Sequence, residues 1–305
     1  MNNIFILTGP TASGKSDLSF KLMTKFPFEI INADLYSAYT HLNIGTAKPS
    51  KKELYKYRHH LVNILEPTMQ YNVSQYCNDA YKCINEILSS NKVPLITGGT
   101  MMYIYQLLNG LSHEYEVTDC DSRLIKYIQN QYSNKQIVES ISKYEPTLTN
   151  KININDSYRI EKLLERIVSN KKTKMNFKGL YNEKNIKIHI IFITIEDREH
   201  LKKSIKKRTC HMLENGLIEE VEDLLNKFNL SKTTQCMKAI GYRETLQYLN
   251  KDITFDELQK AITVSTQQLA KRQITWTNKF KIDYQFSYPN NNYHSLFNYI
   301  KKILN

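Results

Sequence analysis

The chain has 305 residues, of which 41% are hydrophobic and 24% are charged, and this balance excludes a disordered chain. The length suffices for one large domain or two smaller ones. Forty-two Lys and Arg residues against 30 Asp and Glu residues leave a net charge of +12, which weakly favours a polyanionic partner such as nucleic acid.

The five cysteines are scattered and form no C-x-x-C pair, so they indicate neither a disulfide framework nor a zinc site. No leader-like segment opens the chain, and no apolar run reaches membrane-spanning length. We therefore expect a cytoplasmic protein with reduced thiols and no membrane partner.

The first motif is residues 9–16, which read G-P-T-A-S-G-K-S. An apolar run at residues 4–7 precedes it and an amphipathic segment follows, which is the strand, loop and helix order of a phosphate-binding loop. In such a loop, backbone N–H groups converge on an anion at a helix N-terminus. Lys15 would contact the terminal phosphate and the Ser16 hydroxyl would face Mg²⁺. The motif predicts a diphosphate or triphosphate site, whereas an incidental glycine-rich turn is the alternative.

Two further apolar runs end in candidate site residues. Residues 28–34 end in Asp34, which a parallel sheet would place beside the phosphate loop, since ligands gather at the carboxyl ends of such strands. This carboxylate would order magnesium-bound water or accept a proton, or it merely caps a turn. Residues 93–97 lead into Gly98, Gly99 and Thr100 instead of an acid that would help hold magnesium in a nucleotide-hydrolysing protein.

Residues 73–88 have helical periodicity, with Ser74 as the expected cap. Before them, residues 43–49 contain Gly and Pro and predict a loop, whose Lys48 either contacts phosphate or lies in solvent. From residue 113 to about 185 polar residues dominate, and the clearest helix spans residues 160–168 after the cap candidate Asp156. Its opposite face carries the cations Arg159, Lys162 and Arg166, and a Lys-rich run at residues 171–174 follows.

A β pattern returns at residues 186–193, and helical patterns follow at residues 201–213, 217–228 and 258–276. The first of these helices would carry, on the face opposite its apolar residues, a cationic set that could close over a phosphate ligand, namely Lys202, Lys203, Lys206, Lys207 and Arg208. We therefore predict an α/β fold with a P-loop NTPase-like parallel sheet flanked by helices. Residues 1–112 would form the first part of the core, residues 113–185 a helical insertion domain, and residues 186–305 the rest of the core with C-terminal helices.

Five stretches in this order closely resemble the tRNA dimethylallyltransferases, also called tRNA isopentenyltransferases: residues 9–16, 44–49, 98–100, 240–244 and 270–276. The resemblance implies transfer of a dimethylallyl group from dimethylallyl diphosphate to N6 of the adenine just 3′ of the anticodon, with diphosphate released. It implies Mg²⁺ as cofactor, a tRNA anticodon stem-loop as partner, and no consumption of nucleoside triphosphate. The chain has no Cys and His finger after Trp276, which is typical of the bacterial type, and we expect a monomer.

The resemblance also implies roles for residues. Asp34 matches the general base, and Thr100 matches a threonine beside the reacting groups. The implied diphosphate-binding residues are Thr11, Ala12, Ser13, Gly14, Lys15, Ser16 and Arg208, with Ser16 also at the metal. The implied tRNA-binding residues are Asp34, Leu35, Tyr36, Ser37, Thr100, Arg123, Arg159, Ile160, Glu161, Lys162 and Leu163.

The chain departs from the family pattern where Leu35 and Ser37 replace Ser and Gln. Arginines are replaced at four further positions, namely Tyr158, Glu161, Ser204 and Gln267. Each lost arginine removes a phosphate contact, which implies weaker or differently salt-dependent RNA binding. Two alternatives stay open: a small-molecule or nucleotide kinase on the same loop, and an RNA-binding protein that has lost turnover.

Overall fold

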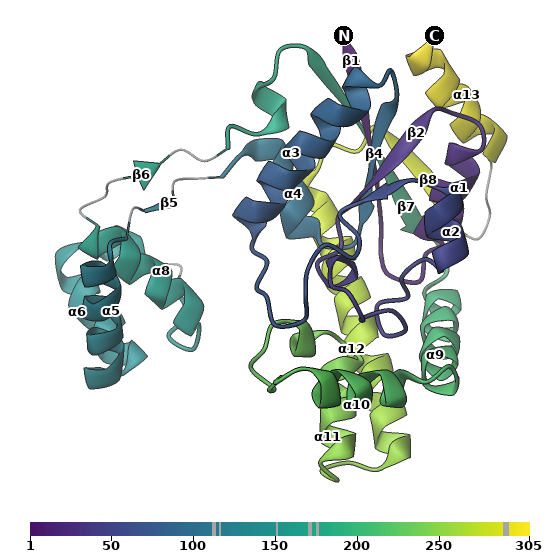
Figure 1. The fold of residues 1–305 in the computed structure, drawn as a ribbon. Helices are drawn as coiled ribbons and strands as arrows, with labels where there is room; N and C mark the ends of the chain where they lie inside the picture. Colours follow the sequence, from purple (N-terminus) through teal and green to yellow (C-terminus); the bar gives the residue numbers. More distant parts are fainter. Residues whose placement is uncertain (112–113, 116, 151, 170–172, 175–176, 289–292) are drawn as a thin grey trace. The chain divides into compact units, whose positions relative to one another are not determined.

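The computed structural model describes the chain except residues 112–113, 116, 151, 170–172, 175–176 and 289–292. In the described residues six strands form one sheet, in the order β3-β2-β4-β1-β7-β8 (Figure 1). They are β1 (Asn2–Thr8), β2 (Phe28–Asn32), β3 (His59–His60), β4 (Val93–Gly98), β7 (Ile186–Ile195) and β8 (Tyr284–Tyr288). Every neighbouring pair is parallel. The predicted parallel α/β sheet is therefore confirmed.

The core forms on both faces of this sheet because its central strands are apolar throughout, as a strand covered on both sides requires. Ile4 and Ile6 alternate with Phe5 and Leu7 along β1, and all four are fully buried. Phe5 and Leu7 pack with residues of α1 (Lys15–Met23) and α13 (Tyr293–Leu304). On the other side, α3 (Val73–Ser89) contacts β2 and β4 and packs against α4 (Met101–Asn109) (Figure 1).

A helical layer lies at the carboxyl ends of the strands (Figure 1). It consists of α9 (Arg198–Glu214), α10 (Leu217–Lys227), α11 (Tyr242–Leu249) and α12 (Phe255–Trp276), and the short helix α2 (Lys51–Lys56) precedes β3. The layer has its own apolar core, which includes Leu217, Val221, Leu258 and Ile262. Tyr39 and Leu42 from the segment after β2 are fully buried in the same core, so this segment is tied to the helices.

Contacts divide the chain into two units, one of residues 1–110 and 179–305 and one of residues 111–178. The second unit contains α5 (Asp119–Gln131), α6 (Asn134–Tyr144), α7 (Pro146–Thr149) and α8 (Ser157–Val168), with the strand pair β5 (Glu114–Tyr115) and β6 (Thr173–Lys174). Its core gathers Ile125, Ile137, Ile160 and Leu164. Residues 171–172 of the expected Lys-rich run lie outside the described residues.

The expected insertion at residues 113–185 is too long at its end, because residues 179–185 belong to the first unit. Leu180 is fully buried, and its short helical turn packs against α4. Gly179, with φ +83°, lies against the backbone of Gly110, where any Cβ would collide. This close approach requires glycine and fixes the point at which the chain re-enters the first unit.

The expected helix caps are correct in one case and wrong in another. Asp156 caps α8, since its side chain accepts a hydrogen bond from the Arg159 N–H at 3.1 Å. α3 is capped by Asn72 and not by Ser74, because Asn72 and Gln75 form a reciprocal capping box. Ser74 lies in the first turn and is buried.

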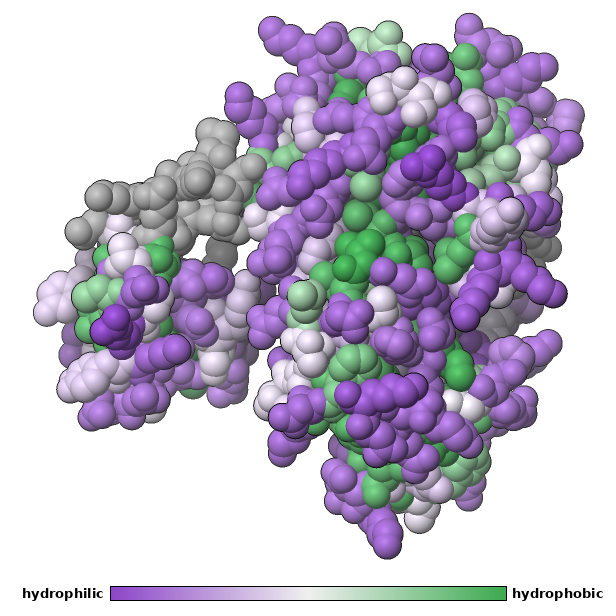
Figure 2. Space-filling view, in the orientation of Figure 1, coloured by the Kyte–Doolittle hydropathy of each residue, from purple (hydrophilic) through white to green (hydrophobic). Residues whose placement is uncertain are grey.

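No helix among the described residues carries an apolar stretch that would cross a bilayer. On the face of the larger unit seen in Figure 2, hydrophilic residues dominate and hydrophobic residues gather near the middle.

Candidate active site

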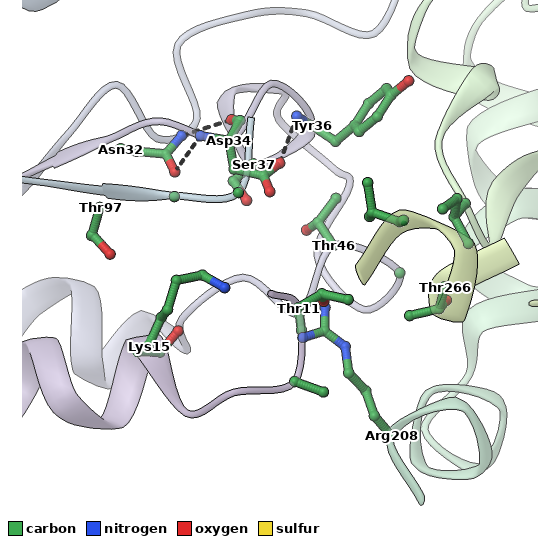
Figure 3. Close-up of a pocket in the computed structure, with 18 of the residues that line it drawn as sticks. Thr11, Lys15, Asn32, Asp34, Tyr36, Ser37, Thr46, Thr97, Arg208 and Thr266 are labelled. Carbon is green, nitrogen blue, oxygen red and sulfur yellow. Dashed lines mark hydrogen bonds between the residues drawn. The ribbon is translucent and has the colours of Figure 1, made fainter. Parts of the chain in front are cut away.

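A cavity of about 510 Å³ opens at the carboxyl ends of β1, β2 and β4, where a parallel sheet binds its ligands (Figure 3). Its walls include the phosphate loop, the segment after β2, the loop at residues 44–49, the end of β4, and the helices α9 and α12. Lys15, Asp34 and Arg208, which belong to three of these segments, therefore face one cavity.

The phosphate loop has the backbone geometry that its sequence predicts. α1 begins at Lys15, and Gly14 before it has a left-handed conformation with φ 78°. Gly9 packs closely against Ile193 of β7. A Cβ at position 9 would lie 3.0 Å from the Ile193 carbonyl oxygen, so a larger residue would be crowded there. Ala12 also has a positive φ, of 60°, which costs about 1 kcal/mol for a residue with a side chain. The loop is thus held in a strained shape, and its residues 11–16 line the cavity.

Lys15 folds over its own loop. Its Nζ donates to the Gly9 carbonyl at 3.0 Å and to the Pro10 carbonyl at 2.7 Å. Burial, and then the nearby Arg208 guanidinium, lower the pKa of Lys15 to about 7, whereas Asp34 opposes this shift. An anion in the cavity would restore the full positive charge of this ammonium group.

Arg208 is the cation of α9 that enters the cavity. It lies on the same helix face as Ile205 and Met212, and Figure 3 shows its side chain extending toward Thr11. The expected grouping of Arg208 with the four lysines of α9 is therefore wrong, since those lysines are exposed on the opposite side. Burial lowers the pKa of Arg208, and Asp34 counteracts the shift. The guanidinium can form the two-oxygen contacts that a diphosphate requires.

Asp34 is fixed in place by the residues around it. The Asn32 side chain donates to the Asp34 carbonyl at 2.9 Å and accepts from the Asp34 N–H at 3.2 Å. One carboxylate oxygen of Asp34 accepts from the Tyr36 N–H at 3.0 Å, which leaves the second oxygen to serve as a base.

Thr100 lies beside Asp34 and supports the same segment. Its hydroxyl accepts from the Leu35 N–H at 3.1 Å, and its N–H donates to the Ala33 carbonyl at 3.0 Å. Thr100 is not among the residues that line the cavity, although Gly98 and Gly99 are. The structure thus assigns Thr100 a contact with the Asp34 segment.

Gln273 is a site residue that the sequence did not single out. Its side chain is 4% exposed and joins two walls of the cavity. Its Oε1 accepts from the Thr11 N–H at 2.7 Å, and its Nε2 donates to the Gly99 carbonyl at 2.9 Å. A Cβ at Gly99 would collide with this amide, and one at Gly98 would collide with the Ala33 backbone, which explains both glycines.

Three further cations line the cavity and were also missed: Lys238, Arg243 and Arg272. The available signal was their position beside or within the motif stretches at residues 240–244 and 270–276. Lys48, by contrast, neither lies free in solvent nor faces the cavity. Its Nζ donates to the Tyr39 carbonyl and to Asn63 Oδ1, each at 2.6 Å, and burial lowers its pKa to about 8.

The segment after Asp34 divides by role. Tyr36 and Ser37 line the cavity, whereas Leu35 packs against the apolar core of the helical layer. The polar contact that the family pattern places at position 35 is therefore replaced here by a packing contact.

The expected tRNA-binding residues of the second unit also divide. Ile160 and Leu163 are 0% and 5% exposed, so their side chains cannot contact RNA while the core of this unit is intact. Arg123, Glu161 and Lys162 are exposed, as is Arg159, which pairs with Asp156 at 3.2 Å. The exposed members remain the candidates for an RNA contact, and the buried pair supports their helix.

The fold and the cavity together define a P-loop α/β protein whose loop opens into a cavity lined by cations. The family model described as IPP transferase matches residues 37–280, and the chain belongs to this family.

Individual relatives agree with this assignment. A tRNA dimethylallyltransferase of Coxiella burnetii is 35% identical over 282 residues, covering 91% of this chain and 90% of the relative. The crystal structure of a tRNA isopentenylpyrophosphate transferase from Staphylococcus epidermidis aligns with a TM-score of 0.71 at 27% identity, covering 100% of this chain and 99% of that one. A eukaryotic dimethylallyltransferase acting on tRNA shares the fold, with a TM-score of 0.84 at 21% identity over 100% of this chain and 80% of its own. The predicted P-loop NTPase-like fold is thereby confirmed.

Proposed function

We propose that the protein transfers a dimethylallyl group from dimethylallyl diphosphate to N6 of the adenine 3′-adjacent to the anticodon of tRNA. The observation that carries this proposal is the convergence of Lys15, Arg208 and Asp34 on one cavity. Two cations suit a diphosphate leaving group, and one carboxylate suits a proton acceptor. The names of the relatives favour this activity over a kinase.

The chemistry follows from these positions. The bond between the allylic C1 and the diphosphate oxygen breaks, and the bonding electrons leave with the diphosphate. Lys15, Arg208 and the N–H groups of the phosphate loop stabilise that developing charge, which is the largest contribution expected in such a site. The adenine N6 forms a bond to C1 and loses a proton to Asp34. Asp34 is placed for this step because only one of its oxygens is occupied by the Tyr36 N–H.

A magnesium ion fits the oxygen donors of this region. The Ser16 side chain is exposed at the first turn of α1, and Asp34 and Thr97 line the same cavity. Hydroxyl and carboxylate oxygens are the ligands that Mg²⁺ prefers. When bound, Mg²⁺ would neutralise part of the diphosphate charge, as the resemblance to the family implies.

The target adenine has to leave its stack to reach Asp34 in the cavity, which costs a few kcal/mol and is least costly in an unpaired loop. The cations Arg243 and Arg272 at the cavity, together with the exposed Arg123, Arg159 and Lys162 of the second unit, would contact the RNA backbone. We expect the reaction to occur in the cytoplasm, and a monomer would suffice, since one chain supplies every residue in this scheme.

The test is incubation with dimethylallyl diphosphate or ATP and an unmodified anticodon stem-loop. The matched control carries guanine at the target position and so lacks the N6 amino group. Prenylated adenosine formed without ATP, and absent from the control, is the expected result. Phosphorylated product would indicate the kinase, and binding without product would indicate an RNA-binding protein.

A further inference from the structure

The loop at residues 43–49 is held by a carboxylate far away in sequence. Glu220 of α10 accepts hydrogen bonds from three successive backbone N–H groups: Asn43 at 3.0 Å, Ile44 at 3.0 and 3.1 Å, and Gly45 at 3.4 Å. The Tyr242 hydroxyl donates to the same carboxylate at 2.6 Å. Successive N–H groups that converge on one anion form a strong and directional site.

The surroundings show that this arrangement fixes the loop. Gly45 lies so close to the Tyr242 ring that a Cβ at position 45 would collide with it. Burial, and then the Glu220 charge, raise the pKa of Tyr242 well above its usual range, so the hydroxyl keeps its proton and donates. Ala47 has a left-handed conformation with φ 48°, which a residue with a side chain retains only where its surroundings hold it.

The same loop forms a wall of the cavity. Gly45, Thr46, Ala47 and Pro49 line it, and Figure 3 shows Thr46 among the lining side chains. Glu220 itself does not line the cavity. The phosphate loop and Arg208, which would hold the diphosphate, have no hydrogen bond with Glu220 among the described contacts. Glu220 therefore acts on the cavity through the loop.

We propose that Glu220 is a positioning residue. It holds the loop at residues 43–49 so that Ala47 and Pro49 contact the prenyl part of the diphosphate substrate. This inference depends on the proposed function. It separates two parts of substrate binding: the phosphate loop and Arg208 bind the diphosphate, and the loop anchored by Glu220 shapes the site for the hydrocarbon. A change at Glu220 should thus affect the prenyl diphosphate and spare inorganic diphosphate.

The test compares Glu220→Gln with Glu219→Gln, which removes the same charge from the adjacent, exposed position of α10. The glutamine keeps the shape of Glu220 but turns one acceptor oxygen into an NH₂ group that faces the loop donors. We expect the KM for dimethylallyl diphosphate to rise about tenfold, as the loss of one charged hydrogen bond implies. The kcat should stay within about twofold, because the lost contact binds the prenyl group equally in the ground state and the transition state. The KM for the stem-loop and the inhibition by inorganic diphosphate should also stay within about twofold, because neither ligand carries a prenyl group.

Each other outcome overturns the inference. Equal KM values in the two variants would show that Glu220 does not shape the site. A lower melting temperature with a lower active fraction and an unchanged KM would show a merely structural role, and a raised KM for the stem-loop alone would assign the loop to RNA. If Glu220→Gln does not fold, Tyr242→Phe removes a single donor and should raise the same KM about twofold. Absence of prenyl transfer by the unaltered protein would instead reject the proposed function.

Discussion

The lowered pKa of Lys15 predicts that diphosphate binding takes up a proton. With a pKa of about 7, Lys15 is about half protonated at pH 7 and about 10% protonated at pH 8. A bound diphosphate raises this pKa again, so binding adds about 0.5 proton at pH 7 and about 0.9 at pH 8. The contribution of Lys15 to diphosphate affinity is therefore greatest below pH 7. Above pH 7 the affinity falls by up to about tenfold per pH unit.

Calorimetry in buffers of different ionisation enthalpy measures this uptake for inorganic diphosphate at fixed magnesium. The ligand and the metal ionise equally with every variant, so the difference between the unaltered protein and Lys15→Met isolates the lysine. Arg208→Gln removes a neighbouring charge that lowers the pKa of Lys15, and it should therefore reduce the uptake at pH 8. The same uptake at pH 6 and pH 8, or no difference from Lys15→Met, would refute the reasoning.

Three further predictions concern other parts of the site. Asp34→Asn keeps an acceptor for the Tyr36 N–H and should lower kcat by about 10² to 10⁴ while tRNA affinity stays unchanged. Unchanged turnover would show that Asp34 is not the general base. Gln273→Ala removes the buried amide that bonds the Thr11 N–H and the Gly99 carbonyl and should lower the free energy of unfolding by about 1 kcal/mol, whereas the exposed Gln268→Ala should not; equal denaturant midpoints would contradict this. Arg159→Ala and Lys162→Ala should each reduce the slope of log K against log salt for stem-loop binding by about 0.7 to 0.9, and an unchanged slope would exclude a phosphate contact.

Local sequence rules were sufficient for the phosphate end of the cavity. The glycines of residues 9–16 and the following helical pattern predicted the loop and the start of α1, although Gly9 also packs against Ile193 and Gln273 binds the Thr11 N–H. Asp34 was also predictable, because a strand end in a parallel sheet has a defined edge. Both predictions needed only neighbours in the sequence and the general geometry of parallel sheets.

The remaining site residues depend on contacts that a single sequence does not reveal. Gln273 is an amide on a helix, and nothing in its pattern distinguishes a buried link between two loops from a surface residue. Lys48 has partners as distant as Asn63. Arg208 is a different case: its spacing from Ile205 and Met212 placed it on the inward face, and grouping it by charge with its neighbours obscured that signal.

The hydrogen bonds of Gln273 and Glu220 explain why the phosphate motif alone could not identify the substrate. The sheet supplies the phosphate loop and Asp34, which many P-loop proteins could supply. The helical layer supplies the rest: α9 contributes Arg208, α10 holds the loop at residues 43–49, and α12 joins the phosphate loop to the end of β4. Because residues of this layer line the cavity beside the phosphate loop, we expect the layer to determine which diphosphate fits. Substitutions in the layer should thus alter selectivity among prenyl diphosphates, whereas substitutions in the phosphate loop should weaken all of them alike.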